Sequence, residues 1–125
     1  MNEEIRISRP DEPFGQANLE KLQTSLGSCP DLAFAYLAEV EVPESGHGPG
    51  LVLFAWLNPA ALGSLRAALN LVSETVAGAI PRERYLDVVI LNSAPELLPE
   101  LEQEDCLLVE VIAEERRSAL EAVNS

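Results

Sequence analysis

The sequence predicts an α+β domain, a ferredoxin-like two-layer sandwich in which two principal helices pack on one face of a mainly antiparallel sheet of four or five strands. Short apolar or alternating runs, typical of strands, are interleaved with segments of helical periodicity. The 125 residues fit one domain, and the 47 % of hydrophobic residues suffice for a core without disulfides or metals. We expect one domain over residues 1–125, with its core at about 4–112 and an acidic, helical tail at 113–125.

The first elements follow from residue spacing. Residues 4–8 alternate as a short edge strand does, and a loop with Pro and Gly follows. Leucines recur at helical spacing from residue 16 to 26, which predicts an amphipathic helix ended by Gly27.

Two strands joined by a hairpin are predicted next. Residues 32–42 should form a strand whose apolar face carries Phe34, Tyr36, Ala38, Val40 and Val42, with Glu39 and Glu41 on a solvated opposite face. The turn formers of residues 43–50 predict a hairpin loop. The continuous apolar run 51–57 predicts a strand that is covered on both faces.

A long helix should follow, with Asn58 as its N-cap, Pro59 in its first turn and Pro81 after its end. It spans residues 60–79. Its predicted buried stripe consists of Leu62, Leu65, Leu69, Val72 and Val76.

The last third predicts four shorter elements. Residues 85–91 and 106–112 read as strands. Residues 94–101 form one or two helical turns limited by Pro95 and Pro99, and residues 113–123 form a terminal helix.

The net charge of −13 narrows the choice of partner. Phosphates would repel such a surface, which argues against nucleic acid, and the same holds for an anionic membrane. A basic protein is the complementary partner. Acidity that serves solubility alone is the competing interpretation.

The acidic residues also suggest where such a partner would bind. No Lys or Arg lies between Lys21 and Arg66, and every charged residue from Glu96 to Glu115 is acidic. The predicted partner-binding residues are Glu39, Glu41, Glu44, Glu100, Glu102, Glu104 and Asp105.

Several motifs resemble those of a known family. The start of the chain from Glu4 to Pro13, the segment 35–40, the Gly/Pro loop before an apolar strand, and the later strand 86–91 together resemble the C-terminal domain of the SseB (enhanced serine sensitivity) family. The similarity covers roughly residues 4–112. It implies a fold and no established enzymatic activity.

Candidate catalytic residues lack the neighbours that catalysis requires. His47 lies between glycines in the predicted hairpin loop, where nothing would hold a general base in place. Cys29 and Cys106 are not in metal-ligand spacing, and the acidic neighbours of Cys106 would raise its thiol pKa. We expect free, unreactive thiols, no metal and no cofactor. A minor alternative is an enzyme that uses carboxylates such as Asp87 for acid–base chemistry.

Two aromatic residues, Trp56 and Tyr36, are expected in the core, although a large aromatic can also anchor an interface. The strand 51–57 would pair readily if its edge were open, so we expect it to be covered, with a second subunit as one cover. The chain is therefore expected to be homo-oligomeric.

Together these features favour a non-enzymatic protein-interaction domain. The start of the chain shows no signal-peptide pattern and no apolar run is long enough to span a bilayer, so we expect a cytoplasmic location. Two more specific alternatives remain open. They are an antitoxin-like immunity protein and a type III secretion-type chaperone. A small acidic domain is compatible with either of them.

Overall fold

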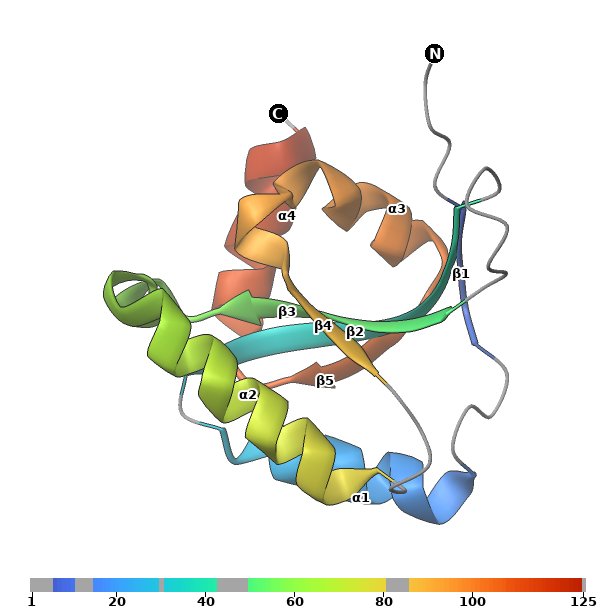
Figure 1. The fold of residues 1–125 in the computed structure, drawn as a ribbon. Coiled ribbons are helices and arrows are strands. Elements are labelled where there is room, and N and C mark those ends of the chain that lie inside the picture. The colour runs from blue at the N-terminus through green and yellow to red at the C-terminus, as the bar shows by residue number, and fades with distance from the viewer. Residues whose placement is uncertain (1–5, 11–14, 30, 43–49, 81–85, 125) are drawn as a thin grey trace.

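A computed structural model describes residues 6–10, 15–29, 31–42, 50–80 and 86–124. Within these ranges the chain forms one mostly antiparallel sheet of five strands and four α-helices, which confirms the predicted α+β class (Figure 1). The strands are β1 (Arg6–Ser8), β2 (Leu32–Glu41), β3 (Gly50–Leu57), β4 (Asp87–Ile90) and β5 (Leu107–Glu110). The helices are α1 (Gln16–Gly27), α2 (Leu65–Ala79), α3 (Leu98–Gln103) and α4 (Ala113–Asn124).

Strand β2 lies at the centre of the pairing. It pairs antiparallel with β3 along one edge, as the predicted hairpin requires. Its other edge is shared by β1, with Ser8 opposite Glu39, and by β5, with Leu107 opposite Tyr36. Two strands from distant parts of the sequence therefore lie end to end beside one neighbour.

Strand β4 completes the sheet. It pairs parallel with β3, because the crossover through α2 returns the chain to the end of the sheet where β3 began. β3 thus has β2 on one edge and β4 on the other. The predicted cover of the run 51–57 comes from these two strands of the same chain.

The two faces of the sheet carry separate helical layers. Helices α1 and α2 cover one face, and α3 and α4 lie over the other (Figure 1). On the α1/α2 face, Leu22 and Val72 pack with Leu53 of β3. On the α3/α4 face, Leu101 and Ala119 pack with Phe34, Phe54 and Tyr36 of the sheet. The predicted pair of helices on one face is confirmed, and the tail expected after residue 112 belongs to the opposite layer.

The start of the long helix differs from the prediction. Asn58 is the N-cap, since its Oδ1 accepts a hydrogen bond from the Ala60 amide at 3.1 Å. Residues 59–64 then form a 3₁₀ helix, and the α-helix begins only at Leu65. A 3₁₀ segment has three residues per turn, so it rotates the register of the helix that it leads into. Leu65 is consequently 42 % exposed, and the buried stripe is Ala68, Val72, Val76 and Ala79.

The later elements also shift at their ends. Pro99 lies in the first turn of α3, where proline is tolerated, and α3 continues to Gln103 instead of stopping at 101. The strand predicted over 85–91 ends at Ile90, and the strand predicted over 106–112 is confined to β5. Residues 4, 5, 43–49 and 85, which also belong to predicted elements, lie outside the described residues.

Asn92 closes the corner after β4. Its Oδ1 accepts from the Leu57 amide at 2.7 Å, and its Nδ2 donates to the Leu57 carbonyl at 3.2 Å. The side-chain amide thereby makes the two hydrogen bonds that a neighbouring strand would make with the last residue of β3. This pairing lets the chain leave the sheet at Leu91 and cross to the α3/α4 face.

Replacing Asn92 with alanine should leave both backbone groups of the buried Leu57 without a partner. We expect Asn92→Ala to lower the free energy of unfolding by about 2 kcal/mol, measured by urea denaturation. The control is Asn70→Ala on the exposed side of α2, which should change it by less than about 0.5 kcal/mol. Equal effects of the two substitutions would contradict the role given to Asn92.

Candidate functional site

The predicted acidic residues form two groups in the structure. Glu39 and Glu41 lie at the end of β2 and are half-buried. The other group lies on α3 and in the turn after it, and consists of Glu100, Glu102, Glu104 and Asp105. Glu44 lies outside the described residues.

Strand β1 connects these two groups. Arg6 forms an ion pair with Glu41 at 3.8 Å, and Arg9, just after β1, forms one with Asp105 at 3.5 Å. β1 also contacts α3 directly. Such exposed ion pairs contribute only about 0–1 kcal/mol each to the stability of the fold. They bring β1 close to both acidic groups but hold them only weakly. Both acidic groups therefore border the same edge of the sheet.

Negative charge is concentrated where α3 ends. The last turn of α3 contains no basic residue, and Glu104 and Asp105 follow at the negative end of the helix dipole. Asp105 has a φ of 54°, in the left-handed region that aspartate tolerates better than most residues. This conformation turns the chain from α3 into β5 and leaves the carboxylate of Asp105 exposed.

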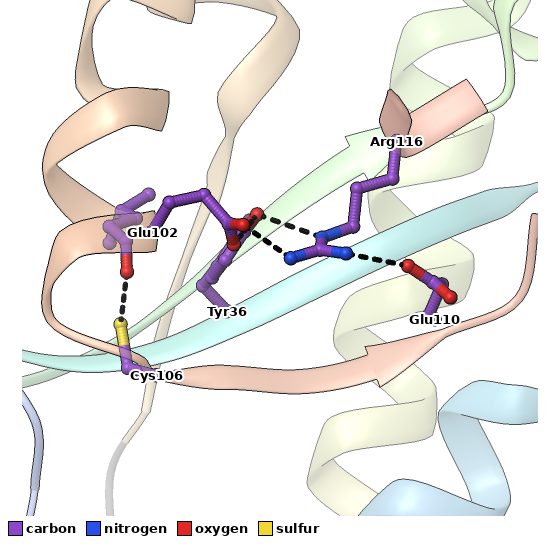
Figure 2. A network of polar contacts seen from close by, with 6 residues as sticks. Tyr36, Glu102, Cys106, Glu110 and Arg116 are labelled. Carbon is purple, nitrogen blue, oxygen red and sulfur yellow. Dashed lines mark hydrogen bonds and ion pairs between the residues drawn. The ribbon is translucent and has the colours of Figure 1, made fainter. Parts of the chain in front are cut away.

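Glu102 occupies a different environment from the other acidic residues. The fully buried Tyr36 donates its hydroxyl hydrogen to Glu102 Oε2 at 2.6 Å. Arg116 of α4 pairs with Glu102 Oε1 through one terminal nitrogen, and with Glu110 Oε2 at 2.9 Å through the other. Its Nε donates to the Tyr36 hydroxyl at 3.2 Å. Figure 2 shows Arg116 between the two carboxylates, with Tyr36 below.

The network changes the pKa of its members. Partial burial alone would raise the pKa of Glu102, but the hydrogen bonds from Arg116 and Tyr36 outweigh burial and hold it below its usual value. Burial, followed by the hydrogen bond to Glu102, raises the pKa of the Tyr36 hydroxyl. The bond to Glu102 raises the pKa of the Arg116 guanidinium. All three groups thus keep one protonation state near neutrality.

This arrangement is suited to holding elements together. Each of the three guanidinium nitrogens of Arg116 already has a partner, and those partners come from β2, α3 and β5. The network therefore fastens α4 to the sheet and to α3. Sequence reasoning did not identify Arg116. The only signal for it was its place as the first basic residue after the acidic stretch that begins at Glu96.

Both cysteines are free and buried. Burial and then the charge of Glu104 raise the pKa of Cys106 to about 11, and its Sγ donates to the Leu101 carbonyl at 3.4 Å. Burial likewise raises the pKa of Cys29. A raised thiol pKa keeps the nucleophilic thiolate scarce, as expected for unreactive cysteines.

The aromatic pair predicted for the core is placed on two strands. Tyr36 is fully buried, and Trp56 stacks on Phe34 with ring centroids 5.5 Å apart. The indole Nε1 of Trp56 donates to Glu115 of α4 at 3.2 Å, a second link between α4 and the sheet. Both residues therefore contribute to the core beneath α4.

Other candidate residues are not brought together. Asp87 is exposed at the start of β4, and His47 lies outside the described residues. Among the residues that the structure describes, no three of His, Cys, Asp or Glu are grouped so as to hold a metal ion. None of the helices in the described ranges is long and apolar enough to cross a membrane.

Among the residues that the structure describes, two surface hollows lie near the candidate residues. One of about 460 Å³ lies where β1 ends and β5 begins, with Arg9, Gln23 and Asp105 among its polar lining. Cys106 also lines it, but its thiol is bonded to a backbone carbonyl and its pKa is raised. The second, of about 740 Å³, lies along α4 beside Arg116. Neither gathers a nucleophile with an activating base.

No family model, no curated protein and no solved structure matches this chain. The resemblance to the SseB C-terminal domain therefore stays a prediction.

Arg116 should be needed to hold α4 in place. We expect Arg116→Ala to lower the free energy of unfolding by about 2 kcal/mol, because it leaves the half-buried Glu102 and the fully buried Tyr36 without their cation. Its neighbour Arg117 is largely exposed, so Arg117→Ala should cost less than about 0.5 kcal/mol in the same denaturation experiment. Matching losses for the two variants would rule out a special role for Arg116.

The lowered pKa of Glu102 predicts how stability depends on pH. A carboxyl group with a folded-state pKa below its unfolded value stabilises the fold above that value, which is ordinarily 4.5, and loses the contribution as pH falls through the folded pKa. Unfolding free energies measured from about pH 6 to pH 3 should therefore fall less steeply for Glu102→Gln than for the unmodified protein. Glu100→Gln, which removes an exposed carboxylate outside the Arg116 network, is the matched control, and equal effects of the two substitutions would contradict the role given to Glu102.

Proposed function

We propose that this chain is a non-enzymatic, cytoplasmic protein-interaction domain that binds a basic protein partner through an acidic surface. We define that surface by its described residues, which are Glu39, Glu41, Glu100, Glu104 and Asp105. Glu102 belongs to the same sequence cluster, but its carboxylate is engaged by Arg116 and Tyr36, so it supports the surface from beneath.

The observation that carries the proposal is the accumulation of like charge at the end of α3. Carboxylates at the negative end of a helix oppose its dipole, and each such contact is unfavourable by about 0.3–1 kcal/mol. Glu104 and Asp105 follow that helix end with only the exposed Arg9 as a counter-charge among the described ion pairs. Glu104 and Asp105 thus destabilise the helix that they follow, and their negative charge can attract a cationic group of another protein.

The remaining chemistry of the chain supports binding more than catalysis. The buried polar groups of the Arg116 network satisfy one another, and both described thiols have raised pKa values. Neither provides a nucleophile or a base aimed at a hollow. Charge complementarity gives association speed and specificity, and it is weakened by salt.

The test is a capture experiment with the full chain immobilised and lysate of its native host applied at low salt. A specific partner should bind at about 50 mM salt and be released by about 500 mM, because screening shortens the reach of surface charge. Glu100→Lys combined with Glu104→Lys should abolish its capture.

The matched control changes the same number of charges elsewhere. Glu20 on α1 and Glu74 on α2 are both exposed, and replacing both with lysine raises the net charge of −13 by the same amount. This control should retain the partner. A partner whose yield is independent of salt, or is lost equally in both variants, would refute binding through the acidic surface.

A further inference from the structure

The two edges of the sheet are protected to different degrees. On one side, the outer edge of β5 is approached by α1, where Gln23 Nε2 donates to the Leu108 carbonyl at 3.0 Å. At the other side, β4 ends the sheet and is hydrogen-bonded only to β3 among the described strands (Figure 1). The first edge is thus partly occupied by a side chain, and the second has no further strand beyond it among the described residues.

Strand β4 has few of the features that usually protect an edge. A terminal strand exposes N–H and C=O groups that can pair with another chain, and natural edges are commonly blunted by lysine, proline or a bulge. β4 reads Asp-Val-Val-Ile from Asp87 to Ile90, and its register with β3 is continuous. Of the features that protect an edge strand, β4 has only its short length and the charge of Asp87. Val89, in contrast, is an exposed large hydrophobic residue at 37 %.

The side chains of β4 define what an added strand would meet. Asp87 and Val89 lie opposite Val52 and Phe54, so both point to the α3/α4 face. Both are exposed. On that face, a neighbouring strand would place one side chain beside a carboxylate and, two residues along, another beside a valine. A basic residue and an apolar residue at this spacing fit the two positions.

We propose that an extended, basic segment of a partner protein adds to the outer edge of β4 as a sixth strand, with a basic residue beside Asp87 and an apolar residue beside Val89. Main-chain hydrogen bonds supply affinity in such strand addition, and alternate side chains supply selectivity. This inference rests on the proposed function for the basic character of the partner, and it adds a second contact at the edge of the sheet opposite the acidic surface.

Charge favours such a segment over a second copy of this chain at the edge. Each copy carries a net charge of −13, so pairing two β4 strands would bring together two strongly negative bodies. It would also place two copies of Asp87 along one short pair of strands. A basic segment would instead be attracted both by the net negative charge of the chain and by Asp87.

The test uses nuclear magnetic resonance of the labelled full chain with a defined probe, the blocked peptide Thr-Lys-Thr-Val-Thr-Lys, which carries lysine and valine two residues apart on one face of a strand. Binding at low salt should shift the amide signals of β4 and slow hydrogen exchange of its outward N–H groups. The same peptide N-methylated at its two central residues keeps its charge, but on each edge a methyl group replaces a hydrogen-bond donor and obstructs strand pairing. It should leave the β4 amides unprotected.

A pair of protein variants tests the position. Val89→Lys should weaken peptide binding by about tenfold, because it removes the apolar contact and repels the peptide at the edge. Val111→Lys adds the same charge at a similarly exposed valine, 39 % exposed, outside β4, and should leave binding unchanged. Thermal melts of both variants establish that they are folded.

The outcomes separate this inference from the proposed function. Equal binding of both peptides, with shifts confined to the acidic surface, would overturn strand addition and leave the proposed function standing. Failure of both peptides to bind at low salt would overturn both. Protection of β4 that grows with protein concentration in the absence of peptide would assign the edge to a second copy and overturn the inference.

Discussion

The burial of strand β2 on both faces and along both edges is the constraint on which the rest of the structure depends. β1, β3 and β5 all pair with β2, and the two cores meet on its opposite faces. Leu37 points into the core beneath α1 and α2, and Tyr36 points into the core beneath α3 and α4. A strand in this position must be apolar on both sides, so its single buried hydroxyl needs dedicated partners.

The Arg116 network meets that need and separates two uses of negative charge. Glu102 and Glu110 are tied to a cation and help to hold α4 against the sheet. Glu100 and Asp105, nearby in the sequence, remain exposed to solvent. The acidic stretch therefore stabilises the fold where its side chains face inward, and adds to the negative surface charge where they face solvent.

Much of the fold could be predicted from the sequence because local signals agreed with the final packing. Alternation, turn residues and the Asn58 cap identified the main strands and helices. The 3₁₀ start of the long helix was not predictable from periodicity, and it moved Leu65 out of the core. The extent of α3 was missed because Pro99 can either stop a helix or lie in its first turn.

The candidate site was predictable in composition but not in arrangement. Clusters of carboxylates are visible in the sequence, so the acidic residues could be named. Nothing local indicates that Arg116 reaches across to Glu102, Glu110 and Tyr36, because that geometry depends on how α4 packs on the sheet. The same holds for the position of β4 at the end of the sheet, since strand order is a non-local property.

The end-to-end placement of β1 and β5 along one edge of β2 has a consequence for how the chain folds. During synthesis, part of that edge has no partner until residues 107–110 emerge, and these follow β2 and β3 by about 50 residues or more in the sequence. Contacts so distant in sequence raise the contact order, and closing them slows folding. A nascent chain in this state exposes an unpaired stretch of β2, which is the interval in which it most needs protection from aggregation.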